Sequence, residues 1–194
     1  MGRILLKNGL VVSRLKSFTG DLLMEDDIIL AIGKFLHNDR DPAIYDVSGC
    51  FILPGFIDIG DAPDYAHGVT ARIPAPAEYL NPAELPDTDA AWEALPDEGE
   101  MPALLCGCPE RALRVYNKGV LECRISIEQL AEALSTMPAR LGGREFRRRG
   151  RLSENMFADV VVWDPSVTSD GENFGAVRYC FKDGALVYAA EAAE

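Results

Sequence analysis

The chain has 194 residues, of which 48% are hydrophobic and 26% are charged, and its formal net charge is −12. This length is enough for a domain with a buried core, and the acidic balance argues against binding DNA or RNA, which requires the neutralisation of phosphates. The apolar runs are shorter than the roughly 18 residues of a membrane span, and the first residues lack the apolar core of a secretory signal, so we expect a cytoplasmic protein without a nucleic-acid or membrane partner.

The five cysteines are odd in number and irregularly spaced. Cys106 and Cys108 are the only close pair, whereas zinc sites usually combine two such pairs or one pair with histidines. The chain has only His37 and His67. We therefore expect reduced thiols in the core or in loops.

The first third of the chain predicts a β layer, because short apolar runs alternate with turn residues. Asn8-Gly9 is a good turn pair inside the first run. Pro54-Gly55 separates the last two runs, because proline and glycine interrupt a central strand. Strands are predicted at 4–12, 21–25, 28–32, 50–53 and 56–59.

The composition changes at about residue 73. Between Ile73 and Glu110 there is no Lys or Arg, and seven of the twelve prolines fall there. Proline disrupts helix interiors and central strands, so this acidic stretch predicts an irregular segment with a short helical turn around 87–95. Such a run is usually a solvated loop, and a docking surface for a basic partner is the alternative.

Helical patterns return after this segment, first at 109–118, with Gly119 as the predicted stop. Ser126 to Gln129 forms a capping-box arrangement, which predicts the start of a second helix. Six arginines then lie between Arg140 and Arg151. They allow a phosphate or carboxylate site, although a solvated connector is the simpler interpretation.

The last part of the chain predicts a return to β structure. Residues 157–165 predict one strand, and residues 177–188 predict a hairpin in which Asp183-Gly184 supplies the turn. Together with the first third, these strands and the two helices indicate an α+β protein that is mainly β.

The sequence DVSGCFILPGFID, from Asp46 to Asp58, resembles the segment by which amidohydrolases of the dihydropyrimidinase, hydantoinase and dihydroorotase type lead into their barrel. Further phrases in the same order extend the resemblance over residues 3–58 and 117–190. In that family, the two ends of the chain form a composite β-sandwich beside a (β/α)8 barrel, which needs about 200 to 250 residues.

The resemblance therefore implies a composite β-sandwich of the amidohydrolase type from residues 1–58 and 144–190. Residues 59–143 are expected to form the acidic, proline-rich segment and a small helical remnant of the barrel. Because Ile59 to Gly143 supplies only 85 residues, no complete TIM barrel is expected.

The resemblance also locates a change in the expected metal site. In the family, Pro-Gly-Phe-Ile-Asp is followed by His-x-His, the first two metal ligands, and here those positions hold Gly60 and Ala62. The family chemistry also uses two further histidines, a carboxylated lysine and a catalytic aspartate, but no lysine occurs between residues 59 and 117. We expect no catalytic residues and no cofactor. Weak candidates for a divalent metal such as zinc are Asp58, Asp61, Asp64 and His67.

Three hypotheses follow. The favoured one is a non-catalytic, barrel-less amidohydrolase-like protein that binds a second copy or another protein chain through the helices at 109–141, where a sandwich without its barrel keeps apolar surface. The alternative is a small metal-dependent hydrolase of C–N (cyclic amide) bonds, with a rebuilt site near Asp61, Asp64 and His67. The third is a remnant without a selected activity.

Overall fold

A computed structural model describes residues 2–13, 17–37, 40–77, 92, 95, 100–105, 107, 111–167 and 176–190. The helical turn predicted at 87–95 lies outside these residues, except for Trp92 and Leu95, and so does the Cys106 and Cys108 pair. No helix in the described part of the chain is long and apolar enough to cross a membrane.

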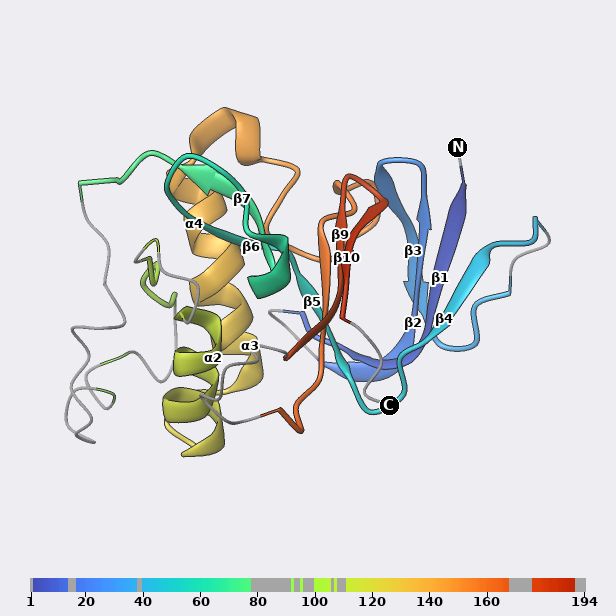
Figure 1. Cartoon of the computed structure of the whole chain (residues 1–194), viewed down its shortest axis with the longest axis horizontal. Coiled ribbons are helices and arrows are strands. Elements are labelled where there is room, and N and C mark those ends of the chain that lie inside the picture. Colours follow the sequence, from blue (N-terminus) through green and yellow to red (C-terminus); the bar gives the residue numbers. More distant parts are fainter. Residues whose placement is uncertain are drawn as a thin grey trace.

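Eight strands form one mixed sheet that joins the two ends of the chain (Figure 1). The strand order is β10-β9-β8-β5-β1-β2-β3, and β4 pairs with β1. The join is the antiparallel pairing of β5 with β8, in which Phe51 lies opposite Trp163. The strands are β1 (Arg3–Val11), β2 (Phe18–Glu25), β3 (Ile28–Gly33), β4 (Ala43–Asp46), β5 (Phe51–Pro54), β8 (Val160–Trp163), β9 (Val177–Lys182) and β10 (Ala185–Ala189).

The sheet curls so that β4 lies against β9. Tyr45 of β4 packs edge-on against Tyr179 and Phe181 of β9, with ring centroids 5.2 and 5.7 Å apart. The enclosed core includes Leu6, Leu22, Ile29, Ile52, Val160, Val162 and Phe181, all fully buried. The predicted fold class, a mainly β protein with a sandwich built from both ends of the chain, is confirmed.

Helices and a second sheet cover the outer face of β5 and β8 (Figure 1). This sheet consists of only two parallel strands, so the described residues form no closed barrel. The helical stretches are followed by π-helical segments at 116–121 and 132–136. The elements of this layer are β6 (Phe56–Ile59), β7 (Val69–Ile73), α2 (Arg111–Val115), α3 (Ile127–Ala131) and α4 (Met137–Leu141).

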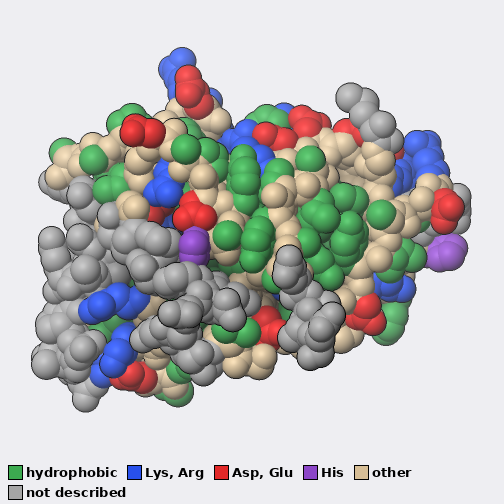
Figure 2. Space-filling view, in the orientation of Figure 1, with side chains coloured by type: hydrophobic (Ala, Val, Ile, Leu, Met, Phe, Trp, Pro, Cys, Tyr) green, Lys and Arg blue, Asp and Glu red, His purple; other side chains and the backbone are tan. Residues whose placement is uncertain are grey.

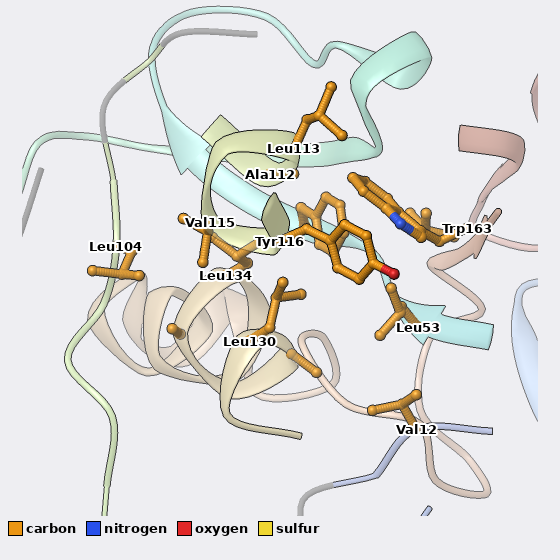
Figure 3. Packing of buried hydrophobic residues seen from close by; sticks show 14 of the residues in the cluster. Val12, Leu53, Leu104, Ala112, Leu113, Val115, Tyr116, Leu130, Leu134 and Trp163 are labelled. Carbon is orange, nitrogen blue, oxygen red and sulfur yellow. The ribbon is translucent and has the colours of Figure 1, made fainter. Parts of the chain in front are cut away.

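One apolar cluster holds the two layers together (Figure 3). Side chains of a strand point alternately to its two faces, so Leu53 and Trp163 point out of the sandwich while their neighbours point into it. Tyr116 and Leu130 from the helices pack on them, and the rings of Tyr116 and Trp163 are 5.6 Å apart. Most of the apolar face of the helices is therefore used inside the molecule.

Several local predictions are confirmed. Ser126 and Gln129 form the capping box of α3, with reciprocal hydrogen bonds of 3.2 and 2.7 Å. Asp183-Gly184 connects β9 and β10, with both residues at positive φ.

The described cysteines, Cys50, Cys123 and Cys180, are free thiols, as expected. Cys50 and Cys180 are buried, whereas Cys123 is exposed. Burial, with a smaller contribution from the nearby carboxylate of Asp159, raises the pKa of Cys180 to about 12. Cys180 is therefore a structural thiol of the sheet.

Two glycines have other roles than those predicted. The Asn8-Gly9 pair forms a bulge within the continuous strand β1 and not a turn, because Asn8 adopts a φ of 65° and donates its backbone N–H to Asp21 at 3.0 Å. Gly119 does not end its helix, which continues to Leu121. A Cβ at Gly119 would collide with Ile125, so this glycine serves close packing.

Candidate functional site

The carboxyl ends of β6 and β7 lie at the same edge of their sheet, because the two strands are parallel. An open pocket of about 420 Å³ lies at this edge, lined by residues 59–61, residues 73–75 and Gly107. In α/β proteins, ligands bind outside the carboxyl ends of parallel strands. This edge is therefore the first place to look for a site.

A buried ion cluster fills the space beneath this pocket. The Asp58 side chain is fully buried, and its Oδ1 lies 3.1 Å from Nη1 of Arg111, which is itself 1% exposed. Its Oδ2 lies 3.5 Å from Nη1 of Arg72. The backbone N–H of Gly107 also donates to Asp58, at 3.2 Å. A buried carboxylate is stable only when it is paired and hydrogen-bonded, and Asp58 is both.

The two guanidinium groups also bind the backbone around β6. Arg111 Nη1 donates to the carbonyl oxygens of Ile57 and Leu104, at 3.0 and 2.8 Å. Arg72 donates to the carbonyl oxygens of Ile59 and Ala62, at 2.6 and 2.7 Å. The planar fork of arginine suits such multiple bonding. Carbonyl groups at the end of β6 are thus turned toward cationic side chains.

The structure does not bring the four predicted metal candidates together. Asp58 lies in the ion cluster, and Asp61 lies exposed at the rim of the pocket. Asp64 and His67 pair with each other across the turn 65–67, with Oδ2 and Nδ1 2.8 Å apart. Within the described ranges, no three His, Cys, Asp or Glu side chains are placed to hold one metal ion.

Two backbone features accompany the absence of histidine from positions 60 and 62. Gly60 has a φ of 129°, a conformation that L side chains rarely adopt. The carbonyl oxygen of Ala62 is engaged by Arg72. These residues therefore do not fit the family's metal: a cation next to Asp58 would face two guanidinium groups, and a histidine at position 60 would be strained.

Sequence reasoning did not single out Arg72 or Arg111. A signal was nevertheless present, because these two residues bracket the stretch without basic residues at 73–110. Both of them pair with Asp58. The basic residues nearest to the acidic stretch are thus the ones that the fold brings to Asp58 at the end of β6.

Comparisons with known proteins agree on one group of enzymes. No family model matches the chain. Over 59 residues, 30% of this chain, it is 42% identical to D-hydantoinases of Ralstonia pickettii and Rhizobium radiobacter. The matched segment spans only 12% of the length of these curated relatives.

Solved structures extend the likeness in fold. A dihydropyrimidinase from Brevibacillus agri aligns with a TM-score of 0.72 and 12% identity, covering 96% of this chain and 95% of that chain. A D-hydantoinase from a Bacillus species aligns with a TM-score of 0.71 over the same shares. An amidohydrolase from Thermotoga maritima aligns with a TM-score of 0.65 and 14% identity. At these identities the structures establish the fold alone.

Proposed function

We propose that this chain, which is similar to hydantoinases of the amidohydrolase superfamily in sequence and in fold, is a non-hydrolytic cytoplasmic binding module that associates with a second copy of itself. The proposal has two parts, the loss of hydrolysis and the self-association. Each part rests on its own observation and has its own test.

The loss of hydrolysis is supported by the ion cluster around Asp58. In the family that the chain resembles, metal ligands follow directly after this aspartate, and the metal activates water. Here Arg72 and Arg111 supply the positive charge next to the carboxylate, at 3.5 and 3.1 Å. A buried arginine remains protonated and has no open coordination position, so it stabilises the strand end without activating water.

Self-association is supported by an edge of the large sheet that no other strand of the described residues covers. Strand β10 lies at the end of the strand order and pairs only with β9 in the described part of the chain. Its sequence, Ala-Leu-Val-Tyr-Ala, contains no charge and no proline. Monomeric proteins commonly protect such edges with charged side chains, proline or a covering segment. An unprotected edge is a template for the addition of another strand.

The surface around β10 is also apolar. Leu186 and Val187 are 40% and 36% exposed. Figure 2 shows hydrophobic side chains gathered over the middle of this face, around β9 and β10. Because two copies with a net charge of −12 each repel one another, an uncharged edge is the surface on which they approach most easily. Antiparallel pairing of β10 with its copy gives a closed, two-fold symmetric dimer.

Size-exclusion chromatography with light scattering tests the proposed self-association. We expect a dimer for the native chain and a monomer for Val187→Lys, because a lysine on an edge strand opposes pairing. The matched control is Leu121→Lys, since Leu121 is 46% exposed on the helical layer and is expected to leave the dimer intact. A native monomer contradicts the proposal. Dissociation by Leu121→Lys alone places the interface on the helices at 109–141, as the sequence predicted.

The similarity to D-hydantoinases favours hydrolysis of a cyclic amide C–N bond as a second candidate. The separation of Asp61 from the pair formed by Asp64 and His67 does not support the rebuilt metal site considered for it. Turnover of hydantoin or dihydrouracil, measured with and without added zinc or manganese, distinguishes the two candidates. Turnover that persists in Asp61→Asn and His67→Gln would establish hydrolysis at another site and contradict the non-hydrolytic proposal.

A further inference from the structure

The arginine-rich stretch after α4 folds around a single pocket. Five of its six arginines line a pocket of about 420 Å³ beside the C-terminal end of α4. Thr136, Ala139, Gly143 and Phe146 complete the lining. The stretch is therefore more than the solvated connector that was the simpler interpretation of its sequence. The five arginines are Arg140, Arg144, Arg147, Arg149 and Arg151.

Two of these arginines are held by carboxylates, and three are not. Arg149 pairs with Asp159 and, at 2.9 Å, with Asp183, while Arg140 pairs with Glu100. The other three are exposed and form no ion pair or side-chain hydrogen bond within the described part of the chain. Their mutual repulsion is thus not offset by any close ion pair within the described residues. They are Arg144, Arg147 and Arg151.

The C-terminal end of the arginine-rich stretch, near Gly150, is held by several contacts, and these order the pocket before any ligand binds. The Thr136 hydroxyl donates to the carbonyl oxygen of Gly150 at 2.7 Å. Gly150 itself packs so closely on Ser135 and Ala139 that a Cβ would collide with both. Together with the pairing of Arg149 to the buried Asp159, these contacts hold the backbone in place. Preorganised cationic groups bind an anion with less loss of entropy.

A second, less polar pocket adjoins the first. It has a volume of about 350 Å³ and shares Thr136, Arg140 and Arg151 with the arginine pocket. Pro54 and Leu152 are among its apolar lining residues. The lining of the second pocket also includes Ser13 and Glu132, so it combines apolar and hydrogen-bonding groups. The two pockets thus offer a cationic end and a neighbouring end of mixed character, which suits a small organic molecule that carries one anionic group and hydroxyl groups.

We propose that the arginine pocket binds the phosphate group of a small phosphorylated molecule, whose organic part extends past Thr136 into the second pocket. Guanidinium groups form paired hydrogen bonds with phosphate oxygens, and the three unpaired arginines more than balance the double negative charge of a phosphate monoester. Both pockets fall in the size range of small-molecule sites. An extended polyanion is a poorer ligand, because the protein as a whole carries a net charge of −12 and repels it.

Calorimetric titration of the full chain with inorganic phosphate, pyrophosphate and glycerol phosphate tests the proposal. We expect saturable binding at one site, with glycerol phosphate tighter than phosphate because it also reaches the second pocket. Replacing two unpaired arginines in Arg144→Gln/Arg147→Gln should weaken binding by at least about tenfold. The control variant Arg114→Gln/Lys34→Gln makes the same change in charge at exposed residues outside the pocket, and should bind as the native chain does.

A thermal melt without ligand separates binding from folding. Removing two mutually repelling charges should leave the melting temperature of Arg144→Gln/Arg147→Gln unchanged or raise it, whereas a structural role for these arginines predicts a decrease. Absence of binding to all three phosphate compounds overturns the proposal, and so does an equal loss in the control variant. Tighter binding of succinate than of phosphate, or binding only to vesicles of anionic lipid, also overturns it.

Discussion

The buried pair of Asp58 and Arg111 provides the sharpest test of how the end of β6 is stabilised. Both side chains are almost completely buried, with exposures of 0% and 1%. Removing one partner of such a pair leaves an uncompensated buried charge, which costs about 3 to 5 kcal/mol. We therefore expect Asp58→Asn to lower the free energy of unfolding by about this amount, a large part of the stability of an ordinary domain.

The partner substitution and the double variant make the test specific. Arg111→Met removes the charge and also the donor to the carbonyl oxygens of Ile57 and Leu104. Each buried carbonyl without a donor costs about 1 to 3 kcal/mol. The double variant Asp58→Asn/Arg111→Met leaves those carbonyls unpaired, and the only charge of the cluster that remains is that of Arg72, which is 13% exposed and still donates to two backbone carbonyl oxygens. Its loss of stability should be smaller than the sum of the two single losses by about 1 to 3 kcal/mol.

Urea denaturation followed by tryptophan fluorescence measures these differences, because the buried Trp92 and Trp163 report the packing between the two layers. Asp61→Asn is the matched control: it makes the same substitution at an exposed residue of the pocket rim and should change stability by less than about 0.5 kcal/mol. A loss below about 1 kcal/mol for Asp58→Asn, or additive losses in the double variant, would refute the reasoning.

Three further predictions concern the backbone, pH and thiol reactivity. Gly60→Ala should destabilise the fold by about 1 to 3 kcal/mol in the same assay, because of the φ of 129°, while Gly2→Ala, with no heavy atom within 4 Å of its Cβ, should be neutral. Hydrogen bonds from the serine two residues on lower the pKa of Asp46. The contribution of Asp46 to the free energy of unfolding is therefore complete above the ordinary carboxyl pKa, and it is lost as the pH falls through the lower pKa of the folded state. Asp46→Asn should thus lose less stability between about pH 5 and pH 2 than the native chain does. Iodoacetamide at about pH 8 should label Cys123 in the folded protein and Cys180 only after unfolding, as read by peptide mass spectrometry; labelling of both at equal rates would contradict the burial.

Local signals were sufficient for most strands, turns and caps. Pro54 is the last residue of β5, and Gly55 separates β5 from β6, because neither residue continues a central strand well. The capping box at Ser126 forms as expected, since it needs only groups within four residues. Asn8-Gly9 was predicted wrongly: its preference for positive φ is satisfied by a bulge as well as by a turn. Only the pairing of β1 with β2 on both sides of the bulge decides between them.

The mainly β composition and the absence of histidine from positions 60 and 62 can be read from the residues themselves, through short-range patterns. The joining of the two chain ends was implied by the resemblance to the amidohydrolase family. Tertiary structure alone decided which charges meet. Arg72 and Arg111 reach Asp58 from 14 and 53 residues away. The sequence placed six arginines between residues 140 and 151, and the fold decided which five of them line one pocket. The physical reason is that a charge is stabilised by neighbours in space, and the packing of α2 and α4 against the sheets sets those neighbours.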